Sequence, residues 1–390
     1  MQYRKLGKTN EMVSILGFGC MRFPVINNDN SQIDEEKAMI LARHAIDNGI
    51  NYLDTAYPYH GKSFSEPGNS ETFVAKIIQD GYREKVKIAT KLPTWLVNSQ
   101  DDMYKLLDEQ LERLGVDCID FYLMHSLNKA NWEKIKKFKF EDFVERAKAA
   151  GKIKHIGFSY HDDKSLFKKI VDDYDWSFCQ IQYNYLDEDF QAGKSGFEYA
   201  AAKGLGIIIM EPLRGGKMVR GLPPEAEEVF KTNNPLRSNA SWAFNWLWNH
   251  NDVHMVLSGM SKLEELKENL IIANETEINI LRPDEIEKIE KVKEIFKSRI
   301  QIPCTSCNYC MPCPSGVNIP KNLSFYNEYF LFDSEENRTR IKTMYHLMQE
   351  DREKSINCIK CGKCENHCPQ KIKIVKEMEN INKLFSKNEN

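Results

Sequence analysis

The segment 51–60, NYLDTAYPYH, places an aspartate at the end of a short apolar run and a tyrosine five residues later. Pro58 cannot continue a strand ladder, so we expect the chain to leave its sheet between Asp54 and Tyr59. A carboxylate and a phenol at such a strand end could handle a proton together. Taken alone, the segment favours the simpler interpretation of a surface loop with a solvated acid and packed tyrosines.

Two further residues reverse that preference. Lys91 follows an apolar strand over 86–90, and His125 follows another over 119–124. A tyrosine has a reference pKa of about 10, and a nearby lysine cation lowers that pKa because it stabilises the phenolate. Asp54 would keep Lys91 charged, and His125 would hydrogen-bond a substrate oxygen. The four residues suit delivery of a proton to a carbonyl oxygen while a hydride reaches its carbon.

A second set of candidate residues is formed by cysteines, of which eight lie after residue 303. The run in 358–369 has the spacing C-x2-C-x2-C-x3-C-P, and the run in 304–314 is one residue shorter before its fourth cysteine. The longer spacing is that of bacterial two-cluster ferredoxins, in which the fourth cysteine binds the other cluster. We therefore predict two [4Fe–4S] clusters, with ligands Cys304, Cys307, Cys310 and Cys368 for one and Cys358, Cys361, Cys364 and Cys313 for the other.

Other uses of these cysteines are disfavoured. Structural zinc is usually bound by two separated cysteine pairs rather than by runs of four, and disulfides are rare in the cytoplasm. The polar, helix-like segment between the two runs is similar to the helical kind of two-cluster ferredoxin domain. Cys20, Cys118 and Cys179 lie in apolar strand contexts, and we expect them to be buried thiols.

The acid, the lysine and the histidine lie far apart in sequence and need a fold that joins distant strand ends. Between residues 15 and 273, apolar strands alternate with helical segments eight times. This pattern predicts an α/β fold, the (β/α)8 TIM barrel, in which chemistry occurs at the carboxyl ends of the strands. An open doubly wound sheet would bring a longer glycine-rich first turn than Gly17-Phe18-Gly19.

Length and composition predict two folded parts. A chain of 390 residues with 42 % hydrophobic residues exceeds most single cores. We predict a barrel over residues 1–281, a linking helix over 282–302 and a small, mostly α-helical ferredoxin-like domain over 303–390. The net charge of −3 and the lack of a long apolar run or a leader peptide predict a cytoplasmic protein with neither nucleic-acid nor membrane partners.

Residues 2–273 resemble the aldo/keto reductases. The matching segments are NYLDTAYPY (51–59), IATK (88–91), IDFYLMH (119–125), IGFS (156–159), QIQYN (180–184), MEPLRGG (210–216) and LSGMSKLEELKEN (257–269). The resemblance implies a catalytic tetrad of Asp54, Tyr59, Lys91 and His125, and NADP(H) or NAD(H) bound across the barrel mouth. It also implies cofactor contacts from Ser159, Gln180, Glu211, Leu213, Arg214, Gly215, Ser258, Gly259, Ser261 and Asn269.

Some positions depart from the family pattern. Met210 replaces an aromatic ring that often stacks on the nicotinamide, and Tyr160 replaces a frequent asparagine. Glu264 and Glu265 lie near the position of an arginine that often grips the 2′-phosphate of NADP, and acids there would repel that phosphate. The choice between NADP and NAD is therefore open.

We expect an NAD(P)-dependent oxidoreductase with a small carbonyl or alcohol substrate. Its clusters would exchange electrons with a redox partner protein, or have a structural or sensing role. A hydride carries two electrons and a cubane cluster accepts one, so direct coupling would need a flavin. A flavin-bridged, ferredoxin-linked oxidoreductase and a non-enzymatic redox sensor or electron relay are the alternatives. Phe64, Trp95 and Trp132, in loops 61–69, 93–100 and 127–139, would line an aromatic substrate pocket.

Overall fold

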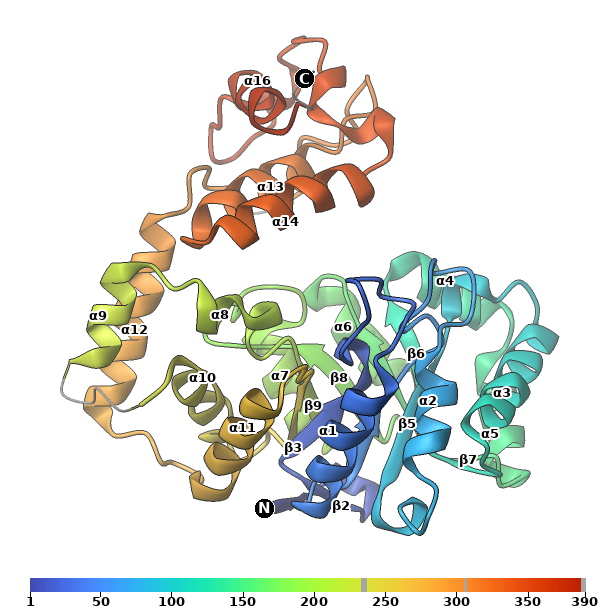
Figure 1. Ribbon diagram of the computed structural model, residues 1–390. Helices are drawn as coiled ribbons and strands as arrows, with labels where there is room; N and C mark the ends of the chain where they lie inside the picture. Colours follow the sequence, from blue (N-terminus) through green and yellow to red (C-terminus); the bar gives the residue numbers. More distant parts are fainter. Residues whose placement is uncertain (233–236, 305–306, 387–390) are drawn as a thin grey trace. The chain divides into compact units, whose positions relative to one another are not determined.

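The computed structural model describes residues 1–232, 237–304 and 307–386. These residues form two compact units, one of Met1–Gly215 with Ala240–Arg282 and one of Gly216–Asn239 with Pro283–Asn390 (Figure 1). The second unit thus takes in a segment that lies, in sequence, between the last two strands of the first. The domain boundaries predicted from the sequence, at residues 281 and 302, stay a prediction.

The first unit is a closed barrel of eight parallel strands, as predicted. Around the barrel the strands follow the order β10-β3-β4-β5-β6-β7-β8-β9, so that the last strand pairs with the first and closes the sheet. The strands are β3 (Leu16–Gly19), β4 (Tyr52–Asp54), β5 (Lys87–Leu92), β6 (Ile119–Leu127), β7 (Ile153–Tyr160), β8 (Phe178–Gln182), β9 (Gly206–Met210) and β10 (Met255–Ser258).

A short hairpin closes the amino-terminal end of the barrel. Its strands β1 (Tyr3–Lys5) and β2 (Met12–Ser14) are antiparallel. Leu6 and Val13 are fully buried and pack in one core cluster with Tyr52, near the start of β4. The opposite end, where the strands finish, is left for chemistry.

Helices cover the outside of the barrel (Figure 1). They are α1 (Glu35–Asp47), α2 (Ser70–Ile77), α3 (Gln100–Leu114), α4 (Lys129–Lys137), α5 (Phe140–Ala149), α6 (Lys164–Asp173), α7 (Gly193–Ala202), α10 (Asn239–Trp248) and α11 (Leu263–Glu275). The start of α3 is a capping box between Ser99 and Asp102, and its end is Gly115 at φ 63°. The sequence indicates both the start and the end of this helix.

Two expectations about the first unit are wrong. The segment expected as a substrate loop over 127–139 contains helix α4, and its Trp132 is buried against Phe140 and Trp176 at ring-centroid distances of 5.2 and 6.2 Å. Trp132 therefore packs in the core, and the expectation that it faces a substrate pocket is wrong. Cys118 is only half-buried, because it precedes β6 at the closed end, whereas Cys20 and Cys179 are buried as expected.

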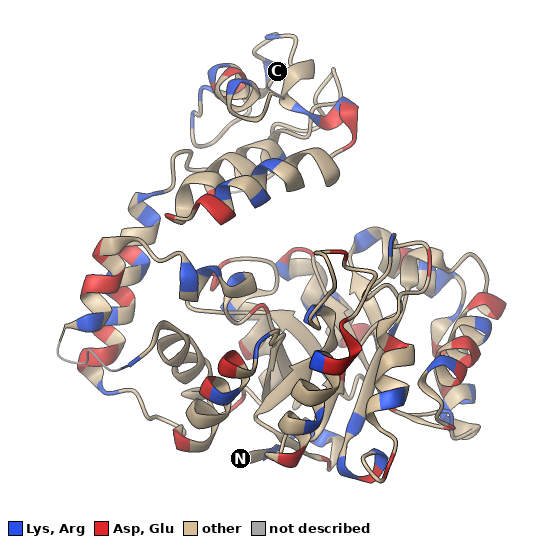
Figure 2. Ribbon diagram, viewed as in Figure 1, with Lys and Arg blue, Asp and Glu red and all other residues tan. Residues whose placement is uncertain are grey.

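The second unit is helical in its described part, in agreement with the mostly α-helical domain that was predicted. Its helices are α8 (Lys217–Arg220), α9 (Pro224–Lys231), α12 (Pro283–Ser298), α13 (Ile319–Leu331), α14 (Glu335–Leu347), α15 (Lys363–Asn366) and α16 (Ile374–Phe385). Helices α9 and α12 pack together and carry charges of both signs (Figure 2). A separate core around Tyr345 and Phe385, stacked at 4.3 Å, joins α13, α14 and α16.

In the part of the chain that the structure describes, no helix combines the length and the apolar character needed to cross a bilayer.

Candidate active site and cysteine cavities

Three neighbouring strands bring the predicted proton-handling residues to one end of the barrel. Asp54 ends β4, Lys91 lies one residue before the end of β5, and His125 lies near the end of β6. Parallel pairing puts these strand ends at the same mouth. Tyr59 follows β4 in a turn in which its amide donates to the carbonyl of Ala56 at 3.1 Å. All four predicted residues therefore meet in one place.

Lys91 is the centre of the hydrogen bonds at this mouth. Its Nζ donates to Oδ1 of Asp54 at 2.6 Å, to the carbonyl of Thr55 at 2.8 Å and to the hydroxyl of Tyr59 at 3.3 Å. The side chains of Lys91 and Asp54 are 1 % and 4 % exposed, so this ion pair is shielded from water. All three ammonium donors are used, which fixes the cation against the phenol.

Burial and charge act in opposite directions on these groups. Burial raises the pKa of Asp54 and outweighs the opposing effect of Lys91. Burial lowers the pKa of Lys91, but Asp54 and Tyr59 more than compensate, and the pKa is raised overall. Burial raises the pKa of Tyr59, Lys91 lowers it and Asp54 raises it again, so the net direction is upward. The lowering of the Tyr59 pKa by Lys91 that the sequence predicted is present, but burial outweighs it in the free protein.

His125 lies at the edge of the phenol. Its ring centroid is 6.2 Å from that of Tyr59 and 5.1 Å from that of Trp95. Burial, with a smaller effect from Lys91, lowers the pKa of His125 well below its ordinary value, so the imidazole is neutral. Its Nδ1 is buried and has no hydrogen-bond partner among the described residues. A neutral imidazole with an unused nitrogen can hydrogen-bond a substrate oxygen.

The next two strands carry the residues that the family pattern assigns to a carboxamide. Ser159 in β7 accepts a hydrogen bond from the amide of Ser126 at 2.7 Å, which leaves its hydroxyl proton available. Gln180 in β8 is 3 % exposed, and its Oε1 has no partner among the described residues. Its amide side is hydrogen-bonded to Asp54. A buried acceptor without a donor fits a ligand that brings an N–H group.

The remaining predicted cofactor residues lie on the loops after the paired strands β9 and β10. Arg214 pairs with Asp187 at 3.2 Å, and Glu211 with Arg22 at 3.9 Å; Leu213 and Gly215 flank Arg214. After β10, Asn269 donates to Oγ of Ser258 at 3.2 Å, and Gly259 and Ser261 follow in the loop. The adjacent strands place both loops at the mouth.

Two contacts at the mouth were missed from the sequence. The amide of Ser261 donates to the carboxylate of Glu265 at 3.0 Å, so an acid of this chain occupies a loop donor. Asp187 accepts from Asn184 at 2.7 Å besides its pair with Arg214. Trp95, which the sequence predicted to line an aromatic pocket, lies beside His125. An acid four residues after Ser261 was the available signal for the first contact.

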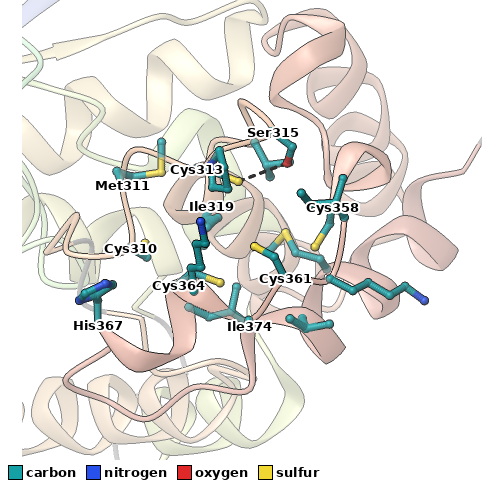
Figure 3. A pocket seen from close by; sticks show the side chains of 18 of the residues that line it. Cys310, Met311, Cys313, Ser315, Ile319, Cys358, Cys361, Cys364, His367 and Ile374 are labelled. Atoms are coloured by element: carbon teal, nitrogen blue, oxygen red, sulfur yellow. Dashed lines mark hydrogen bonds between the residues drawn. The ribbon is translucent and has the colours of Figure 1, made fainter.

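The predicted cluster ligands line two cavities in the second unit. The larger has a volume of ≈ 320 Å³; its cysteines are Cys310, Cys313, Cys358, Cys361 and Cys364. Figure 3 shows these thiols around one space, with Cys310 at its edge. The narrower, of ≈ 20 Å³, is lined by Cys304, Cys307, Cys310 and Cys368. Among the described residues, no three His, Cys, Asp or Glu side chains are close enough to hold a single metal ion.

Cys313 has hydrogen-bond donors that its spacing did not reveal. Its Sγ lies 3.3 Å from the hydroxyl of Ser315, the contact dashed in Figure 3. Burial raises the pKa of Cys313, but hydrogen bonds from Ser315 and from the amides of Val317 and Gly316 lower it overall. The thiolate is the form that binds metal, so these donors favour a ligand.

Comparison with known proteins gives the same two parts. A sequence model described as the aldo/keto reductase family matches residues 15–294, and one described as a 4Fe-4S dicluster domain matches residues 303–372. The chain belongs to the aldo/keto reductase family. Outside the reductase barrel it carries a 4Fe–4S domain, as the sequence predicted.

Individual relatives support this membership. The uncharacterized oxidoreductase YrpG of Bacillus subtilis is 31 % identical over 234 residues, which are 55 % of this chain and 68 % of that protein. L-galactose dehydrogenase of Arabidopsis thaliana is 24 % identical over 76 % of this chain and 96 % of its own length. Aldo-keto reductase yakc [NADP(+)] of Schizosaccharomyces pombe is 29 % identical over 55 % of this chain and 61 % of its own length.

The reductase barrel also has solved counterparts. The holo form of aldo-keto reductase AKR11C1 from Bacillus halodurans is similar with a TM-score of 0.60 and 25 % identity, and the match covers 75 % of this chain and 96 % of that chain. Its apo form gives a TM-score of 0.56, and that match also covers 75 % of this chain and 96 % of the other.

Proposed function

We propose that the barrel reduces a small carbonyl compound, or oxidises the corresponding alcohol, with NAD(P)H as the hydride donor and Tyr59 as the proton donor. The observation that carries this proposal is the hydrogen-bonded set in which Lys91 holds both Asp54 and Tyr59 at the barrel mouth. In carbonyl reduction the hydride comes from the cofactor, so the protein has to supply a proton donor and the charges that support it.

Each residue has one task in this proposal. Reduced nicotinamide, when bound, supplies a hydride to the substrate carbon. Tyr59 donates its phenolic proton to the substrate oxygen, and solvent later restores that proton. Lys91 stabilises the phenolate that forms, since its cation lies 3.3 Å from the hydroxyl. Asp54 keeps Lys91 charged and in position, and neutral His125 hydrogen-bonds the same substrate oxygen.

The cofactor would lie against β7, β8 and the loops after β9 and β10. The unpartnered Oε1 of Gln180 and the hydroxyl of Ser159 suit the carboxamide. Glu265 hydrogen-bonds the amide of Ser261, which makes this loop acidic where a 2′-phosphate would add further negative charge. We therefore propose that NADH is used in preference to NADPH, although the relative yakc carries NADP(+) in its name.

The test compares two tyrosines in the same turn. Turnover of NADH and NADPH is followed with a panel of aldehydes and ketones, in the anaerobic full chain. Tyr59→Phe should lower kcat by about 10²- to 10⁴-fold, the usual contribution of a general acid. Tyr57→Phe is the control, since the Tyr57 ring contacts Arg113 at 4.9 Å and not Lys91. Equal activity of Tyr59→Phe and the wild-type chain would refute the assignment.

We propose further that the second unit binds two [4Fe–4S] clusters. The linings of the two cavities support this, because Cys313 lies with the second cysteine run and Cys368 with the first. The larger cavity offers room for a cubane as it stands. The narrower one would require its thiols to move outward. Cys310 borders both spaces, so the two clusters would be neighbours.

The mismatch between a two-electron hydride and one-electron clusters favours one alternative, a flavin at the barrel mouth that couples the cluster domain to hydride chemistry. Flavin bands in the absorption spectrum of the purified chain would support that alternative over the nicotinamide proposal. Without them, the clusters serve a separate electron exchange or the stability of the domain.

A further inference from the structure

We propose that the surface around the larger cysteine cavity is a docking site for a small acidic electron-carrier protein, which exchanges single electrons with the cluster held there. This inference rests on the proposed clusters and adds where, and with what kind of protein, electrons are exchanged. It depends on residues in the cavity wall and next to it that do not bind metal.

The wall of the larger cavity exposes large apolar side chains. Tyr309 and Ile359 both line the cavity, yet they are 67 % and 65 % exposed. Ile356, two residues before the ligand Cys358, is 68 % exposed. Apolar groups gathered on a protein surface are typical of an interaction site. The exposed ligand Cys361 lies in the same wall, so an electron would have a short way to leave.

Lysines lie in and beside this cavity wall. The segment 354–376 contains six lysines and one glutamate, in a chain of net charge −3, although Lys354 pairs with Asp351 just before the segment. Lys360 and Lys363 line the cavity, and no acidic residue does. Lys360 pairs with Glu379 at 2.6 Å. The exposed Lys363, in the lining, and the exposed Lys376, next to the lining residue Val375, form no ion pair within the described part of the chain, and their unneutralised charge attracts an acidic partner.

The narrower cavity lacks these features. Apart from its cysteines its lining contains no ionisable residue; Asn308 and Gln370 are its polar members. Of the two cavities, only the larger combines lysines with exposed apolar side chains in its lining. This asymmetry assigns the exit of electrons to the cluster of Cys313, Cys358, Cys361 and Cys364.

The exchange balances as a one-electron step. A reduced [4Fe–4S]⁺ cluster returns to [4Fe–4S]²⁺, and the electron converts a flavodoxin from its oxidised form to its semiquinone, which takes its proton from solvent. No bond forms between the proteins. Charge complementarity of this kind mainly raises the rate of encounter, and it weakens as salt screens it.

The test uses the reconstituted full chain, reduced with dithionite and mixed with an acidic flavodoxin in a stopped-flow instrument. Lys363→Gln/Lys376→Gln should lower the second-order rate by about tenfold at low ionic strength. The loss should vanish at about 1 M salt. Ile356→Ser should lower the rate several-fold at every salt concentration. The control Lys164→Gln/Lys169→Gln removes the same charge from exposed barrel positions and should leave the rate unchanged.

Two readouts separate the failure of this inference from failure of the clusters. Iron content and the electron paramagnetic resonance of the reduced variants report whether the clusters are present. Variants with both clusters and an unchanged flavodoxin rate would overturn the docking site but leave the clusters in place. The same loss with basic cytochrome c as the acceptor would also overturn it, because a basic protein gains nothing from these lysines. A wild-type chain without iron would instead overturn the proposed clusters.

Discussion

Replacement of Lys91 by methionine tests the centre of the proposed mechanism. Methionine keeps much of the volume of the side chain and removes its charge. Nζ of Lys91 lies 3.3 Å from the hydroxyl of Tyr59. At an effective dielectric constant of about 20, a full phenolate charge at that distance is stabilised by about 5 kcal/mol. If roughly half of that charge develops in the transition state, the loss is about 2.5 kcal/mol, or roughly 70-fold in kcat.

The same change also affects stability. Asp54 would be left buried without its cation, and breaking a buried pair on one side costs about 3–5 kcal/mol. The double variant Asp54→Asn/Lys91→Met removes both charges and should recover most of that stability but none of the activity. Circular dichroism and urea unfolding check the fold of each variant, and single-turnover oxidation of NADH with an aldehyde gives the chemical step. A folded Lys91→Met chain with wild-type turnover would refute the role of Lys91 while leaving the fold intact.

Three further predictions concern the cofactor, pH and one cluster. Burial holds the pKa of Tyr59 above its ordinary value of about 10. The kcat/KM for carbonyl reduction should therefore stay level from pH 7 to about 9, and the kcat/KM for alcohol oxidation should rise with pH. A fall in kcat/KM for reduction below about pH 9 would contradict this. Glu265→Arg frees Ser261 and supplies a cation, so the NADPH-to-NADH ratio of kcat/KM should rise at least tenfold; an unchanged ratio argues against phosphate binding there. Ser315→Ala removes a donor to Cys313 and should lower one cluster potential by roughly 40 mV in a redox titration, whereas an equal shift of both potentials would not fit.

The barrel could be predicted because its signals are local. Apolar strands alternate with helices that end at glycines such as Gly115, and this alternation predicts the eightfold repeat. Because the strands are parallel, their carboxyl ends bring Asp54, Lys91 and His125 together. Cysteine spacing is equally local, since three thiols at intervals of three residues can surround one cluster.

What the sequence did not reveal depends on burial and on the path of the folded chain. Trp132 is in an amphipathic segment that the sequence predicts as a loop, and its contacts with Phe140 and Trp176 show that it belongs to the core. The net direction of the Tyr59 pKa depends on how deeply the mouth buries the phenol, which no motif records. The contact between Ser261 and Glu265 required the path of the loop after β10.

The absorption spectrum of the anaerobically purified full chain, recorded together with its iron content, tests most directly whether one polypeptide joins a flavin-free reductase barrel to two [4Fe–4S] clusters. We predict about eight iron atoms per chain, broad charge-transfer absorption that bleaches with dithionite, and no flavin bands. Zinc in place of iron, or resolved flavin bands, would contradict the proposal.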